Sequence, residues 1–161
     1  MYIETERLVM RNFNYEDLKG ALEYLSDSDV MKYIEAPFTY KESKDFIKKY
    51  GISSNPLIYA LIDKNKGNII GHIIFHKFDY EDVYEIGWII DKRCWGKNYC
   101  FEISKEIFNY AFNEMRINKV VAEVVTDNKK SIALIKKLGM ISDEPLNQDN
   151  SELRTFSVTR Y

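Results

Sequence analysis

The chain has 161 residues, the length of one ordinary domain, so we expect a single domain over residues 1–161. Lys and Arg number 23 and Asp and Glu number 25, a formal charge of −2, which argues against a nucleic-acid partner that needs a strongly basic surface. Hydrophobic residues make up 45% of the chain and aromatic residues 14%, enough apolar surface to offset the entropy of ordering it, which argues against a disordered protein.

Cysteine usage and hydropathy indicate a cytoplasmic protein. Two cysteines, Cys94 and Cys100, do not make a disulfide framework, and we interpret them as reduced thiols that only pack. The first residues lack the basic start and apolar run of a signal peptide. Since no apolar stretch approaches the ~20 residues of a membrane span, no membrane partner is expected.

The first elements are a strand and two helices. Residues 8–13 are short and apolar enough for a strand. Residues 15–25 predict a first helix, because apolar side chains recur on one stripe: Leu18, Ala21, Leu22 and Leu25. A second helix begins at Thr39, which forms a capping box with Glu42, and ends at Gly51.

The middle of the chain predicts three strands that form a meander. Residues 57–62 and 68–78 read as strands joined by a hairpin turn at residues 65–68. A further turn at residues 79–82 leads into a third strand at residues 83–91.

After this meander the hydrophobic period changes to that of a helix. Residues 99–115 carry apolar side chains on more than one side, which predicts a deeply buried helix. A β-branched strand at residues 120–125 follows, and then a helix at residues 128–138 that Gly139 ends. The order strand, helix, strand predicts that residues 83–91 and 120–125 are parallel, with a right-handed crossover.

The tail adds a strand at residues 153–159 and a short one near Met140. Together these elements predict an α/β (α+β) fold. Its central sheet is mixed and mainly antiparallel, contains one parallel pair of strands, and is flanked by helices.

The segment between residues 91 and 99 predicts an anion site. It joins the end of a strand to the start of a helix, whose unpaired N–H groups and positive dipole end favour a phosphate. Gly96 lets the backbone approach an anion closely, and Arg93 and Lys97 supply positive charge nearby. The alternative interpretation is a loop whose glycine serves only a turn.

Arg93-x-x-Gly96-x-Asn98 resembles the pyrophosphate-binding motif of the GNAT superfamily of acyl-CoA N-acyltransferases, which is normally Gln/Arg-x-x-Gly-x-Gly/Ala. Its surroundings resemble the RimJ/RimL-like branch, the ribosomal-protein N-terminal acetyltransferases. The segments similar to that branch follow its order along the chain: residues 5–11, 84–91, 95–97, 119–125, 128–131 and 136–140.

The resemblance implies a GNAT-like sheet in which the parallel strands splay apart and hold the pantetheine arm of acetyl-CoA. It implies an enzyme that transfers an acetyl group from acetyl-CoA, its co-substrate, to a primary amine. The acceptor would be a protein N-terminus or a small amine that attacks directly in a ternary complex without a metal. Because dimers are common among such relatives, the resemblance also implies a homodimer as one assembly to test.

An alternative function rests on Asn98, which stands where the motif has Gly or Ala. Asn tolerates a left-handed backbone better than most residues, but its side chain takes up space that the motif leaves for pyrophosphate. A chain with a degenerate motif would be a non-catalytic relative that holds acyl-CoA or a partner protein without chemistry.

The resemblance also implies particular cofactor contacts. Pantetheine is expected on the side chain of Asn128 and on three backbone positions, Trp88, Ile89 and Ile90. Pyrophosphate is expected beside Arg93 on the backbone N–H groups of Cys94, Trp95, Gly96, Lys97, Asn98 and Tyr99.

Catalysis needs a base, because most alkyl amines are protonated near pH 7 and cannot attack a thioester. Glu85 is the candidate, since partial burial among apolar neighbours would raise its pKa; the alternative is an ordinary exposed glutamate. His72 and His76 share one face of the preceding strand and are further candidates, although a structural role is the simpler interpretation of each. They have no ligand-type companions, so a metal site is not expected.

The leaving thiolate needs a proton. In the RimL-like branch the serine of Asn-x-x-Ser matches Ser131, which is therefore the candidate acid. The same spacing also fits a helix in which Asn128 is the N-cap, and this structural interpretation stays open.

Overall fold

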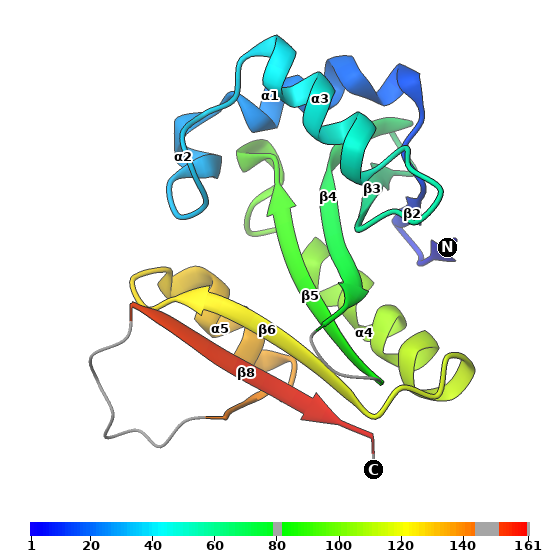
Figure 1. Ribbon diagram of the computed structural model, residues 1–161, viewed down its shortest axis with the longest axis vertical. Coiled ribbons are helices and arrows are strands. Elements are labelled where there is room, and N and C mark those ends of the chain that lie inside the picture. Colours follow the sequence, from blue (N-terminus) through cyan, green and yellow to red (C-terminus); the bar gives the residue numbers. More distant parts are fainter. Residues whose placement is uncertain (79–81, 144–151, 161) are drawn as a thin grey trace.

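The computed structural model describes residues 1–78, 82–143 and 152–160, and across these residues an eight-stranded sheet runs in the order β1-β2-β3-β4-β5-β6-β8-β7 (Figure 1). Neighbouring strands are antiparallel except for β5 and β6, which are parallel. The strand bounds are β1 Ile3–Glu4, β2 Leu8–Arg11, β3 Ile58–Asp63, β4 Asn68–Lys77, β5 Val83–Ile90, β6 Lys119–Val125, β7 Ile141–Ser142 and β8 Leu153–Thr159.

Helices cover the two faces of the sheet unequally. The helical segments are η1 Tyr15–Asp17, α1 Leu18–Leu25, α2 Ser28–Met31, α3 Tyr40–Tyr50, η2 Lys92–Cys94, α4 Tyr99–Asn109, η3 Tyr110–Glu114 and α5 Lys129–Lys137. Figure 1 shows α1, α2 and α3 together at one end of the molecule, while α4 and α5 lie behind the sheet. The face of β5, β6 and β8 that is turned toward the viewer carries no helix along most of its length.

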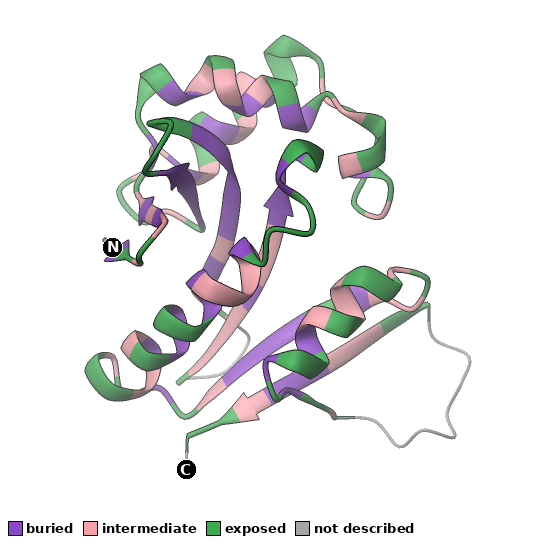
Figure 2. Cartoon of the chain, turned by 180° about the vertical axis from the view of Figure 1, so that it is seen from behind, coloured by how far each residue is buried: buried purple, intermediate pink, exposed green. Residues whose placement is uncertain are grey.

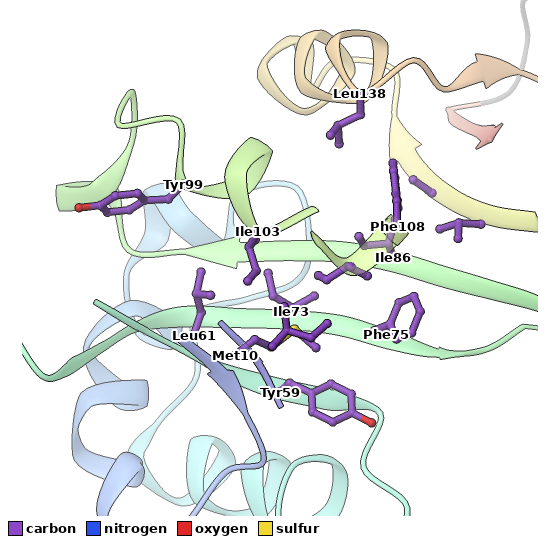
Figure 3. Close-up of a cluster of buried hydrophobic side chains, with 14 of the residues drawn as sticks. Met10, Tyr59, Leu61, Ile73, Phe75, Ile86, Tyr99, Ile103, Phe108 and Leu138 are labelled. Atoms are coloured by element: carbon purple, nitrogen blue, oxygen red, sulfur yellow. The ribbon is translucent and has the colours of Figure 1, made fainter. Parts of the chain in front are cut away.

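The apolar side chains form two cores, one on each face of the sheet. The larger lies between the sheet and α4 and α5; Figure 3 shows members of it, among them Met10, Ile73, Ile86 and Ile103. The smaller lies under α1 and α3 and includes Ile89 from β5. Alternate residues of β5 are therefore anchored in opposite cores, as the two-residue period of a strand requires.

The parallel strands pair only at their beginnings. The register joins Val83 to Lys119, Tyr84 to Val120 and Glu85 to Val121, and it ends there although both strands are described in full. Beyond this point β5 stays paired with β4 as far as Ile90, and β6 stays paired with β8 over its whole length. Each strand keeps its hydrogen bonds on the outer side, so the sheet opens between them (Figure 1). This confirms the expected splayed pair.

Most of the predicted elements are confirmed, with shifts at their ends. Helix α3 begins with the predicted capping box: Thr39 N donates to Glu42 Oε2 at 2.7 Å, and Glu42 N donates to Thr39 Oγ1 at 3.3 Å. The predicted helix over residues 15–25 is a 3₁₀ turn followed by α1. The predicted turn at residues 79–82 has only Asp82 within the described residues, at φ 61°.

The prediction of a deeply buried helix over residues 99–115 was wrong in two respects. Helix α4 ends at Asn109 and continues as a single π-helical stretch, η3. Lys105, Glu106 and Asn109 are exposed, so α4 has a solvent face, which Figure 2 shows along its outer side. In the described part of the chain, no helix has the length and apolar character needed to cross a membrane.

Candidate acetyl-CoA site

The open end of the β5–β6 gap leads directly into the N-terminus of α4. After β5, the Asp91 carboxylate accepts a hydrogen bond from Arg93 N at 2.8 Å and begins the short helix η2. Gly96 then takes φ 76° and Asn98 takes φ 65°, both left-handed, and α4 begins at Tyr99. Asn98 is the N-cap, but its side chain does not cap the helix. The first N–H groups of α4 therefore lack the usual side-chain acceptor and are available to an anion.

Asn98 is held toward α5 instead. Its Oδ1 accepts a hydrogen bond from Lys137 Nζ at 2.8 Å, and the same ammonium lies 4.4 Å from the centre of the Phe101 ring. At the other end of α5, Lys130 Nζ lies 4.3 Å from the centre of the Trp95 ring. Helix α5 thus brings two cations to the loop before α4. Lys137 belongs to a segment that resembles the family, but no role was predicted for this residue.

Arg93 is engaged by carboxylates. Its Nε lies 3.0 Å from Asp91 Oδ1, and its Nη2 lies 2.6 Å from Glu23 Oε2 on α1 and also contacts Asp91 Oδ2. Hydrogen bonds to Asp91 first and then to Glu23 raise the pKa of Arg93. The guanidinium is therefore neutralised locally, and its visible role is to fasten the loop to α1. This differs from the expectation that Arg93 supplies free positive charge to a phosphate.

Backbone groups of β5 face the gap at alternate residues. Asp91 N donates to Ile70 O at 2.9 Å, so these two residues form a hydrogen-bonded pair of the antiparallel ladder. Because such pairs alternate, Ile89 bonds to β4, whereas Trp88 and Ile90 direct their backbone groups toward β6. The structure brings two of the three expected pantetheine positions to the gap; the backbone of Ile89 faces the other way.

Two indole N–H groups make hydrogen bonds beside the gap between β5 and β6. Trp88 Nε1 donates to Ser104 Oγ on α4 at 2.7 Å, and Trp95 Nε1 donates to Ile90 O at 2.9 Å. The Ile90 carbonyl thus already has a donor. We expect the N–H of Ile90, rather than its carbonyl, to be open to a ligand.

Asn128 and Ser131 lie where β6 ends and α5 begins. Asn128 Oδ1 accepts a hydrogen bond from Ser131 N at 3.2 Å, so Asn128 caps α5 and the structural interpretation of this pair is confirmed. Within the described residues the Ser131 hydroxyl has no hydrogen-bond partner, and the side chain is only partly buried. Because the cap uses the backbone N–H of Ser131, it leaves the Ser131 hydroxyl available to donate a proton.

Glu85 lies at the last paired residue before the strands separate. Its side chain is 21% exposed, which contradicts the alternative of an ordinary exposed glutamate. Burial raises the pKa of Glu85 above its ordinary value, and the charge of Glu123 acts in the same direction, while His76 opposes it. A carboxylate with a raised pKa at the apex of the gap has the properties of a general base.

The two histidines have different surroundings. His72 is fully buried, and its Nδ1 lies 2.9 Å from the hydroxyl of Tyr24, among the rings of Phe13 and Phe46. Burial lowers the pKa of His72 to about 3, so it is neutral near pH 7, and its structural interpretation is confirmed. His76 instead lies beside Glu85, with its Nε2 3.3 Å from Glu85 Oε2.

The cysteines are passive in this arrangement. Burial raises the pKa of Cys100 to about 12 and raises that of Cys94, so both stay thiols near pH 7. Both are free, and Cys94 is buried. Neither has the lowered pKa that a nucleophilic thiol needs.

An open cavity of about 490 Å³ borders the N-terminus of α4. It borders Asn98 and Phe101 but is ringed by four glutamates, so its charge does not suit a phosphate. The remaining lining residues are Glu4, Thr5, Glu6, Glu102 and Glu106. The anion site is therefore expected on the α5 side of the loop, where Lys130 and Lys137 lie.

Comparison with known proteins gives the family. Residues 7–141 match the model of the acetyltransferase (GNAT) domain. An uncharacterized N-acetyltransferase, YnaD, of Bacillus subtilis (strain 168) is 38% identical over 141 residues, which cover 87% of this chain and 82% of that protein.

Solved structures agree. A GNAT-family acetyltransferase from Bacillus anthracis is 30% identical, with a TM-score of 0.89 over 99% of this chain and 98% of that one. Spermidine N-acetyltransferase from Vibrio cholerae, crystallised with CoA and spermine, has a TM-score of 0.78 at 19% identity, covers 97% of each chain, and so shares the fold. This chain therefore belongs to the GNAT superfamily of acetyltransferases and is an N-acetyltransferase that uses acetyl-CoA.

Proposed function

We propose that this enzyme acetylates a primary amine, either a protein N-terminus or a small amine, by direct attack on acetyl-CoA in a ternary complex. We place it in the RimJ/RimL-like branch, on the segments that resemble that branch, and treat residues 1–161 as one domain. The observation that carries the proposal is the gap between β5 and β6, which ends at an N-terminus of α4 without a side-chain cap. A long thioester with a diphosphate matches both features.

In this proposal the pantetheine arm lies between the strands. Gap-facing backbone groups of Trp88 and Ile90 bond it, and the start of α5 at Asn128 lies beside it. The diphosphate lies on N–H groups of the loop from Cys94 through Tyr99, with the ammonium groups of Lys130 and Lys137 nearby.

Asn98 supports binding rather than a disabled site. It adopts the left-handed backbone that the motif glycine would supply, and Lys137 holds its side chain. Arg93 contributes by fastening the loop to Asp91 and Glu23. The site residues thus divide into those that contact the cofactor and one that shapes the loop.

Glu85 removes a proton from the acceptor ammonium through a water molecule. The neutral nitrogen attacks the thioester carbonyl, and a gap-facing N–H at Trp88 or Ile90 stabilises the oxyanion. The C–S bond then breaks, and Ser131 donates a proton to the thiolate. The sheet face that bears Glu85 carries no helix along most of its length, which gives an acceptor a way in (Figure 1).

The experiment follows release of the CoA thiol from acetyl-CoA with peptides bearing free N-termini, amino acids, polyamines and amine antibiotics. Turnover on at least one class supports the proposal, and the acetylated atom is then located by mass spectrometry. Calorimetry with CoA is run in parallel. Tight CoA binding without turnover on any amine would instead favour the non-catalytic alternative. A homodimer and a cytoplasmic location stay predictions.

A further inference from the structure

His76 and Glu85 are directly opposite each other on β4 and β5. They are register partners in the antiparallel pair, so their side chains project from the same face of the sheet. His76 Nε2 lies 3.3 Å from Glu85 Oε2, and the side chains are 25% and 21% exposed. This face is the one that α1 and α3 cover farther along β4, at His72. Figure 1 shows the end of β4 extending beyond these helices, and His76, near that end, is only partly buried.

A backbone carbonyl fixes which ring nitrogen of His76 carries the hydrogen. His76 Nδ1 lies 2.8 Å from Lys77 O. Because a carbonyl oxygen only accepts hydrogen bonds, Nδ1 must be the donor, and the neutral ring then presents a lone pair at Nε2. That lone pair faces the Glu85 carboxylate, which also only accepts when ionised. The contact between Nε2 and Oε2 is favourable when one proton lies between them.

We propose that His76 and Glu85 form a dyad that stores one proton, with His76 as the positioning residue that acts through Glu85. This inference rests on the proposed function of Glu85 as the base. The proton leaves the acceptor ammonium, crosses one water and reaches Glu85, where the Nε2 lone pair of His76 shares it. The freed electron pair of the nitrogen forms the C–N bond, the C–S bond of the resulting oxyanion then breaks, and the dyad later returns its proton to solvent. Ser131 gives its proton to the thiolate, and the second N–H proton of the acceptor nitrogen replaces it on Ser131.

The charged groups around the dyad set its chemistry. Glu123 projects from the same face of β6, two residues beyond the register partner of Glu85, and it raises the pKa of Glu85. Lys119 lies on that face as well, but Asp143 holds it at 2.7 Å. The opposite residues of β8, Thr155 and Ser157, bear no charge. When its ring is protonated, His76 is the group on this face that opposes the effects of burial and of Glu123 on the pKa of Glu85.

Two substitutions test the dyad through the pH profile. In His76→Gln, kcat falls about tenfold while KM for acetyl-CoA is unchanged, because only proton transfer is impaired. The acidic limb of kcat/KM moves to higher pH, since Glu85 loses the neighbour that lowers its pKa. In the matched variant Glu123→Gln, the same limb moves to lower pH. A His76→Gln enzyme with parental kcat and parental profile overturns the dyad.

A second measurement does not need turnover. The chain has two histidines, so long-range ¹H–¹⁵N spectra contain two imidazole rings, and His72 is an internal reference that is neutral near pH 7. We expect neutral His76 to carry its hydrogen on Nδ1, and we expect its Nε2 resonance at a fixed pH to change in Glu85→Gln. An Nε2–H tautomer, or an Nε2 resonance that is the same in Glu85→Gln and in the parent, overturns the proposal. An enzyme inactive on every amine but with this coupling intact contradicts the proposed function alone.

Discussion

Lys137 Nζ donates a hydrogen bond to Asn98 Oδ1 at 2.8 Å, so the last turn of α5 is tied to the residue that immediately precedes α4. These residues are 39 positions apart and belong to the two helices that follow the two splayed strands. The contact therefore bridges the far end of the gap. It also brings a positive charge to the helix end that already favours an anion.

We expect Lys137→Met to weaken CoA binding. Loss of one cation near the diphosphate costs about 1 kcal/mol, or roughly a fivefold rise in Kd, and the effect shrinks as salt is raised. Calorimetry with CoA at two salt concentrations measures it. Lys136→Met is the matched control, since that exposed side chain on the same helix turn makes no such contact within the described residues and should leave Kd unchanged. Equal Kd values for both variants would contradict this role.

Asn98 gives a prediction about the backbone. At φ 65° a β-branched residue is strained, so Asn98→Val should lower the free energy of unfolding by roughly 1–2 kcal/mol and weaken CoA binding. Asn98→Gly relieves that strain and should bind CoA within a few-fold of the parent. Urea unfolding and calorimetry provide the two readouts. If Asn98→Gly creates binding that the parent lacks, the parental site is disabled and our view of Asn98 is wrong.

The sequence predicted those parts of the fold that local patterns determine. The capping box at Thr39, the hairpin turn before β4 and the parallel pair all follow from spacing and residue type. The two residues of β1 and the four of α2 are too short for any period to show, and neither was predicted. The end of α4 was missed because residues 110–115 keep helical spacing, although the backbone changes to a π-helix.

The candidate site, like the fold, was predicted from the sequence only in part. Motif spacing located the loop and Glu85, but contacts between distant residues determine what each side chain does. Arg93 is 70 residues from Glu23, its partner on α1, and no local pattern predicts that pair. The backbone direction of Ile89 depends on the register with β4. Lys137 stood in a recognised segment, yet its position over the α4 N-terminus required the fold.

Glu85→Gln tests whether Glu85 is the general base. A positioned general base contributes roughly 10²–10⁴-fold, so kcat should fall by about 10² or more, while calorimetry finds parental affinity for CoA. Because Glu85 has a raised pKa, the parental rate should fall on the acidic side of a pH profile, and this limb should be absent from the variant. Glu152→Gln, an exposed glutamate just before β8, serves as the control and should match the parent. Parental rates in Glu85→Gln remove this residue from the mechanism.

His72 makes the fold sensitive to acid. Burial lowers its pKa to about 3 in the folded chain, against about 6.5 when unfolded, so the unfolded state takes up more protons below pH 6.5. The stability that neutral His72 provides is complete above pH 6.5 and is lost as the pH falls toward 3, amounting to about 2 kcal/mol between pH 6.5 and 5. Urea unfolding at each pH measures this slope. His72→Gln should be less stable at pH 7 but lose less stability on acidification. A parental slope in His72→Gln would show that other groups cause the acid sensitivity.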